Sequence, residues 1–150
     1  FNFVSIDVED FIVKIASEGI APTGEDVDIE EYKAVFRYQG FMPFSYNMFT
    51  DKPADSKTGV SFESSLHHLS NGEAELGFDY VFVNGSESTI VVSVEIYDGQ
   101  DRLVSSFKPI DVPLVRSKLT TVKARFLTSE AEGGVTIIPD YDGEHNIEIN

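Results

Sequence analysis

The chain has 150 residues, with 11 Lys and Arg against 26 Asp and Glu, and its formal net charge is −15 at pH 7. This charge argues against binding to a nucleic-acid backbone or to an anionic membrane face. Hydrophobic residues make up 41% of the chain, too many for a disordered acidic tail. No stretch approaches the roughly 18 apolar residues that a membrane-spanning helix needs, so we expect a single globular domain over residues 1–150.

The N-terminal residues predict a strand followed by a helix. In the stretch from Phe1 to Ile6, Phe1 and Phe3 alternate with Asn2 and Val4, which is typical of a strand. After it, apolar residues recur at helical spacing, at Val8, Phe11, Ile12 and Ile15. Asp7 is the expected N-cap and Gly19 the stop, so we expect a helix near residues 8–18.

The next part of the chain predicts strands separated by polar loops. Residues 33–38 alternate, with Ala34, Phe36 and Tyr38 on one face. Residues 41–49 are rich in aromatics but contain a proline, which predicts an irregular edge or bulged strand whose aromatics belong mostly to the core. Residues 50–59 read as a polar loop, and 61–65 as a short strand.

The second half of the chain has the strongest strand pattern. Apolar residues of one parity run from Ala74 to Phe82, up to a turn at 84–86. A hairpin joins 91–97 to 103–107 through Asp98 and Gly99. Pro109 and Pro113 bracket a predicted break in the strand. Apolar and polar side chains alternate again over 119–127, which predicts another strand, and two short strands are expected at 134–139 and 146–149. Seven to nine strands with frequent turns predict an all-β sandwich with one short helix.

Chemistry-bearing motifs are absent from the sequence. There is no cysteine, and no nucleophile elbow, phosphate-binding loop, dinucleotide fingerprint or H-E-x-x-H zinc motif. His67 and His68 are adjacent on a strand and point to opposite faces, so with His145 they make a poor zinc site. We therefore expect no catalytic residue, no cofactor and no metal. Calcium binding by the acidic stretches at 25–31 and 140–144 stays open, with solvated loops favoured.

Four aromatic side chains are candidates for stacking on sugar rings. They lie close together in the sequence and are Tyr38, Phe41, Phe44 and Tyr46. A carbohydrate-binding accessory domain is therefore the main alternative function, with a hydrolase as a third.

Two stretches resemble a known family. They are Tyr38-Gln-Gly-Phe-Met-Pro-Phe-Ser-Tyr-Asn-Met-Phe-Thr50 and Pro113-Leu-Val-Arg-Ser-Lys-Leu-Thr-Thr-Val-Lys-Ala-Arg-Phe-Leu-Thr128. Both are similar to segments of the fimbrillin-like (Mfa-like) surface lipoproteins of Gram-negative gut and oral anaerobes. The matching positions are Gly40, Pro43, Asn47, Pro113, Leu114, Arg116, Thr120, Leu127 and Thr128, with Gly134 to Ile138 fitting a further short strand. Ser117 stands where the family usually has Asn, and Ala124 where it has Gly.

The resemblance implies a fold, a location and partners. The fold would be a transthyretin-like or Greek-key β-sandwich, the C-terminal domain of a longer surface protein. That protein would be anchored to the outer membrane through a lipid-modified segment upstream of Phe1. The function would be that of a non-catalytic pilus or pilus-associated adhesion subunit, whose partners are other fimbrillin-like subunits or copies of itself, with a possible host or glycan ligand.

In such subunits, a strand from one chain completes the sandwich of the next. Two segments are candidates for that strand, because both are short, terminal and flanked by Gly and acids. They are 134–138, with Gly134, Val135 and Ile137, and 145–149, with His145, Ile147 and Ile149.

Overall fold

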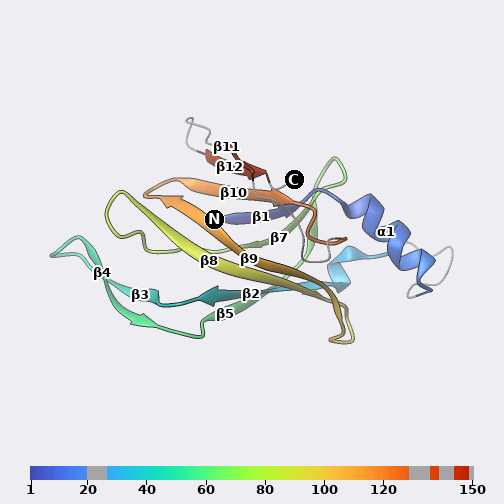
Figure 1. Ribbon diagram of the computed structural model, residues 1–150, viewed down its shortest axis with the longest axis horizontal. Coiled ribbons are helices and arrows are strands. Elements are labelled where there is room, and N and C mark those ends of the chain that lie inside the picture. Colours follow the sequence, from blue (N-terminus) through green and yellow to red (C-terminus); the bar gives the residue numbers. More distant parts are fainter. Residues whose placement is uncertain (20–26, 129–135, 139–143, 149–150) are drawn as a thin grey trace.

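Two β-sheets face each other across an aromatic core, and one helix covers one end of them (Figure 1). The computed structural model describes residues 1–19, 27–128, 136–138 and 144–148. The prediction of an all-β sandwich with one short helix is confirmed. Helix α1 spans Val8–Ser17, close to the predicted 8–18, and a 3-10 turn, η1, spans Ile29–Glu31.

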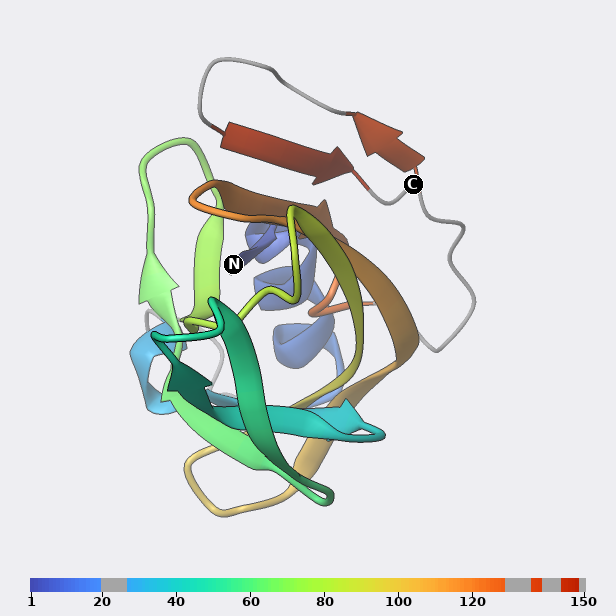
Figure 2. The same ribbon diagram turned by 90° about the vertical axis from the view of Figure 1, so that its left-hand side faces the viewer.

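The first sheet has six strands and contains two parallel pairings. Its order is β11 (Thr136–Ile138), β12 (Glu144–Glu148), β10 (Leu119–Ala124), β1 (Asn2–Ser5), β7 (Ala74–Phe78) and β6 (His67–His68). Strand β10 runs parallel to β1 on one side and parallel to β12 on the other. Figure 2 shows the red β11–β12 hairpin along the outer side of β10.

The second sheet has four strands, and a separate hairpin projects from it. Its order is β5 (Ser61–Ser65), β2 (Lys33–Gln39), β8 (Glu87–Tyr97) and β9 (Leu103–Val115). The hairpin consists of β3 (Met42–Asn47) and β4 (Lys52–Lys57), which pair only with each other. It extends beyond the sandwich at the end opposite to α1 (Figure 1).

The described residues contain twelve strands rather than seven to nine. Part of the difference is the stretch 50–59, which is not a polar loop throughout, because it forms β4. The predicted break between Pro109 and Pro113 does not end the strand, since both prolines lie inside β9, but the β8–β9 ladder shifts register between Phe107 and Ile110, at Pro109. Both prolines are tolerated there because β9 is at the edge of its sheet, where a missing backbone N–H need not interrupt a second ladder.

Helix α1 forms where the apolar spacing predicts it, but its cap works differently. Val8, Phe11 and Ile15 are buried against the sheets. Asp7 occupies the N-cap position without a side-chain cap to the helix. Its buried carboxylate instead accepts hydrogen bonds from Thr128, from N at 2.8 Å and Oγ1 at 2.6 Å, and from the Ser5 hydroxyl. It therefore joins the start of α1 to the segment that follows β10.

The core is built from aromatic rings contributed by both sheets. Phe3 lies near the middle, with its ring centroid 5.3 Å from Phe36 and 5.4 Å from Phe126. Phe36 in turn stacks on Phe62 at 4.5 Å. The other core side chains come from every second residue of the strands, as in β8, where the buried residues are Ile90, Val92, Val94 and Ile96.

Strand β7 contains an irregularity that reverses which of its side chains face the core. Phe3 pairs with Gly77 but Val4 pairs with Glu75, so Leu76 is an extra residue without a partner on β1. Such a bulge shifts the alternation by one position. Leu76 and Gly77 are both buried, whereas Phe78 is exposed. The single parity predicted from Ala74 to Phe82 therefore holds only as far as Leu76.

Gly77 provides the first test of this arrangement. A Cβ on Gly77 would lie 2.6 Å from Cε2 of Phe36 and 3.1 Å from Cβ of Ser64. We expect Gly77→Ala to lower the free energy of unfolding by about 1–3 kcal/mol, because the Phe36 ring has to move within a packed core. Urea denaturation measures the change.

Gly99→Ala is the matched control, because its nearest described neighbour would be the Glu31 carbonyl oxygen at 3.5 Å. We expect this control to change the free energy of unfolding by less than about 0.5 kcal/mol. Equal effects of the two substitutions would contradict the tight contact at Gly77.

Candidate functional site

The projecting β3–β4 hairpin carries large apolar side chains in solvent. Phe41 is 76% exposed, Phe44 62%, Met48 87%, and Phe49 is fully exposed. The prediction that the aromatics of 41–49 belong mostly to the core is therefore wrong, and Met42 is the large side chain of this stretch that is buried there. The reason is topological, because a hairpin that leaves the sheet has no second layer to cover it.

The four predicted stacking aromatics have different fates. Tyr38 is only 5% exposed, and its hydroxyl donates a hydrogen bond to the Asp79 carboxylate. Burial, followed by that hydrogen bond, raises the pKa of Tyr38. The ring therefore offers little surface for stacking, although Tyr38 lines the first of the hollows described below. Tyr46 stacks on Phe82 with centroids 5.5 Å apart, and Phe41 and Phe44 remain exposed.

A second set of exposed aromatics comes from the segment after the bulge. Phe78 points outward because the bulge at Leu76 reversed the alternation at the end of β7, and Tyr80 and Phe82 are exposed in the irregular segment that follows. The rings of Phe78 and Tyr80 meet edge to face, with centroids 4.8 Å apart. We call the exposed side chains of both segments together the aromatic end; they are Phe41, Phe44, Met48, Phe49, Phe78, Tyr80 and Phe82. Large apolar side chains exposed in this way are candidates for contacts with another molecule.

An arginine holds the hairpin against the body of the sandwich. Arg116 lies in the β9–β10 turn and donates to both carboxylate oxygens of Asp51, at 2.8 and 2.5 Å. It also donates to the Tyr46 hydroxyl at 2.7 Å, and that hydroxyl donates to Asp51 at 2.6 Å. The hydrogen bonds from Arg116 and then from Tyr46 hold the pKa of Asp51 well below its usual range. We call these three residues the clasp.

Two hollows lie on either side of residues 79–83. The first encloses about 360 Å³, and its lining includes Phe44, Lys57, Asp79 and Tyr80. The second encloses about 400 Å³ and is lined mainly by apolar side chains, among them Phe78, Tyr80, Val81, Leu114, Val115 and Leu119. We call the second one the apolar groove. It adjoins the β9–β10 turn that carries the clasp arginine.

The candidate exchange strands lie at the edge of the six-stranded sheet. Ile137 is in β11, and His145 and Ile147 are in β12, which pairs with β10 in parallel from Leu119–Glu144 to Lys123–Glu148. Gly134, Val135 and Ile149 lie outside the described residues.

The structure brings no metal site together among the residues it describes. No group of three or more His, Asp or Glu in the described ranges could hold a metal ion. His67 and His68 are exposed in the short strand β6. Residues 25–26 and 140–143 of the two acidic stretches lie outside the described part.

The clasp predicts a local effect of Arg116. We expect Arg116→Ala to raise the hydrogen-exchange rates of the β3–β4 amides several-fold, because the bidentate contact that fixes the hairpin is lost. Arg116→Lys should have an intermediate effect, since a lysine keeps the charge without the planar fork. Amide exchange followed by mass spectrometry measures both.

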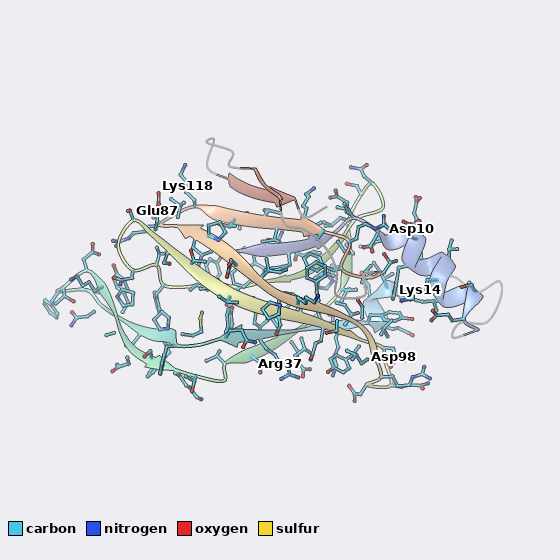
Figure 3. The ribbon with its side chains drawn as sticks, in the orientation of Figure 1. Asp10, Lys14, Arg37, Glu87, Asp98 and Lys118 are labelled. Carbon is cyan, nitrogen blue, oxygen red and sulfur yellow. The ribbon has the colours of Figure 1, made fainter. Side chains whose placement is uncertain are left out.

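Arg37→Ala is the control for this measurement. Arg37 pairs with Glu95 at 3.1 Å on the outer face of the four-stranded sheet (Figure 3). Exchange in the hairpin should be unaffected by its loss. If the hydrogen-exchange rates of the β3–β4 amides are the same with and without the Arg116 side chain, the clasp does not restrain the hairpin.

Comparison with known proteins identifies a family without assigning a function. The model of a family of unknown function (DUF6562) matches residues 1–150, and the chain belongs to that family. No curated protein and no solved structure matches the chain. In the described part of the chain, no helix has the length and apolar character required to cross a membrane.

Proposed function

We propose that this member of the DUF6562 family is a non-catalytic structural or adhesion module that joins other protein chains by strand addition at the edge of β10. The observation that carries the proposal is the pairing of β12 with β10. Strand β12 lies near the end of the chain, is five residues long, and occupies an edge that another strand could occupy in its place.

Backbone pairing explains how such a joint forms without a special recognition sequence. A parallel ladder from Leu119 to Lys123 offers N–H and C=O groups along β10 to any strand in register. If β12 leaves, these groups lose their partners, which is costly unless water or another strand replaces it. A β12 strand from a second chain restores the same ladder at little net cost.

The outermost strand of the sheet offers a further point for growth. Within the described residues, β11 pairs with β12 and has no strand on its other side. An open edge of this kind is where one chain adds to the next in strand-addition assemblies.

The cellular setting in this proposal is carried by the sequence resemblance. The segments 38–50 and 113–128 are similar to fimbrillin-like surface lipoproteins, which favours a pilus or pilus-associated role at the cell surface. The partners would be related subunits or copies of this chain, with anchoring to the outer membrane through an upstream lipid-modified segment.

Engineered cysteines test the strand joint, since the natural sequence has none. Leu119 and Glu144 are direct partners in the β10–β12 ladder. If β12 adds to a neighbouring chain, an L119C chain mixed with an E144C chain should form a disulfide between chains, because ladder partners lie within disulfide range. Non-reducing electrophoresis of the mixed, differently sized chains detects it.

A mixture of K108C and E144C chains is the control, because Lys108 lies on β9 in the other sheet. Deleting residues 144–150 should abolish any oligomer that depends on this joint. Disulfides confined to a single L119C/E144C chain, together with light-scattering masses unaffected by the deletion, would count against strand addition.

A glycan ligand is the second candidate function, and the first hollow favours it. Phe44 and Tyr80 offer exposed rings there, beside the charged groups of Lys57 and Asp79. Sugar sites commonly combine an aromatic face for the ring with polar groups for the hydroxyls. Asp79 accepts hydrogen bonds from Tyr38 and from the backbone N of Tyr80, which hold its carboxylate in place beside the hollow.

Isothermal titration against a panel of glycans tests this second function. We expect Phe44→Ala to weaken any binding about tenfold or more, because a stacking face is lost. Phe41→Ala is the matched control, since Phe41 is exposed but does not line the hollow. Tyr46→Ala should weaken binding as well by freeing the hairpin that carries Phe44. A glycan bound equally well by all three variants would not be using this hollow.

A further inference from the structure

The tip of the β3–β4 hairpin holds two apolar side chains in a fixed position. Asn47 Oδ1 accepts hydrogen bonds from the backbone N of Phe49 at 3.0 Å and of Thr50 at 3.2 Å. The clasp fixes Asp51, the next residue of the turn, to Arg116. Met48 and Phe49 are therefore presented to solvent by a restrained turn, and a partner that buries them need not order the backbone first.

The same chain contains a surface that can receive this tip. The apolar groove encloses about 400 Å³ and is lined mainly by apolar side chains, including Phe78, Val81, Leu114 and Leu119. Neither Met48 nor Phe49 is among its lining residues, so a tip does not fill the groove of its own chain. A phenylalanine side chain that enters such a groove buries most of its 150–250 Å² of apolar surface.

Charge favours contact between two copies at this end. The segments 41–59, 78–83 and 114–119, together with Glu87, the partner of Val115, contain four cations (Lys52, Lys57, Arg116 and Lys118) and four acids (Asp51, Asp55, Asp79 and Glu87), which is a net charge of zero. The whole chain has a net charge of −15. The acids that repel one copy from another are therefore concentrated elsewhere, and this end is where two chains approach with least repulsion.

The β3–β4 hairpin and the β9–β10 turn both lie at the end of the molecule opposite to α1 (Figure 1). The groove adjoins the β9–β10 turn, whose Arg116 contacts the base of the tip. When the tip and the groove lie at the same end of a chain, two copies related by a two-fold axis can each place a tip in the groove of the other. We propose that Met48 and Phe49 of one copy insert into the apolar groove of a second copy, and that the second copy does the same in return.

Self-association measured by sedimentation over a range of concentrations tests the proposal. We expect the wild-type chain to dimerise and the M48S/F49S variant to dissociate with a constant about tenfold or more higher, because two apolar contacts per chain are lost. V13S/L103S is the matched control, since both residues are exposed apolar side chains outside this end. Thermal melts of each variant confirm that it is folded.

A mixing experiment identifies the groove as the receptor. Val115→Trp fills the groove from the end of β9 and should also prevent dimers. A mixture of M48S/F49S with V115W chains should form heterodimers, because one intact tip still meets one intact groove. A wild-type monomer at all concentrations, or a mixture that stays monomeric while the wild type dimerises, would overturn the proposal.

Experiment can distinguish the tip-in-groove contact from strand addition. Deletion of 144–150 removes β12 residues but leaves the tip and the groove, so tip-dependent dimers should survive it. If dimers are lost in M48S/F49S but not in the deletion variant, the tip-in-groove contact is supported. If they are lost only in the deletion variant, strand addition is supported and the tip-in-groove contact is not.

Discussion

The exposure of Phe78 at the aromatic end depends on one bulge in β7. Leu76 has no partner on β1, so the last two residues of β7, Gly77 and Phe78, face the opposite way from what simple alternation requires. Gly77 is turned toward the core as a result, and the absence of a side chain there leaves room for the Phe36 ring. Phe78 is turned outward. Without the bulge, Phe78 would face the core, and the apolar groove would lose one of its walls.

A single carboxylate fixes the other end of the arrangement. Asp7 joins the start of α1 to Thr128, 121 residues away, through a hydrogen bond of 2.8 Å from the Thr128 backbone N. The Ser5 hydroxyl, bound to the same carboxylate, also accepts from the backbone N of Phe126 at 3.0 Å. These contacts hold the chain just after β10 against β1. The strand that offers its edge to β12 is therefore anchored by buried polar contacts as well as by its ladder.

Residue spacing and turn residues predict the elements of this fold that form between residues close together in the sequence. The helix at 8–18, the alternation of 33–38 and the hairpin at Asp98 follow from spacing and turn residues, and the structure has all three. The bulge at Leu76 and the parallel pairing of β10 with β12 depend on partners far along the chain, which no local window contains. The exposure of the aromatics at 41–49 could not be predicted for the same reason, because only the topology shows that no described strand or helix covers the β3–β4 hairpin. Arg116 is one of the positions that match the fimbrillin-like segments. Its contact with Asp51 gives a structural reason for an arginine there.

The two proposed contacts differ in what they recognise and in the assemblies they allow. Strand addition at β10 uses backbone groups, so it is permissive in sequence, and a head-to-tail joint of this kind can repeat from chain to chain. The tip-in-groove contact uses side chains of fixed shape, and its reciprocal geometry closes after two copies. The strand joint lies along the edge of the six-stranded sheet, whereas the aromatic end lies where the β3–β4 hairpin projects. Where both contacts form, strand addition would set the length of an assembly, and the aromatic end would pair one such assembly with another.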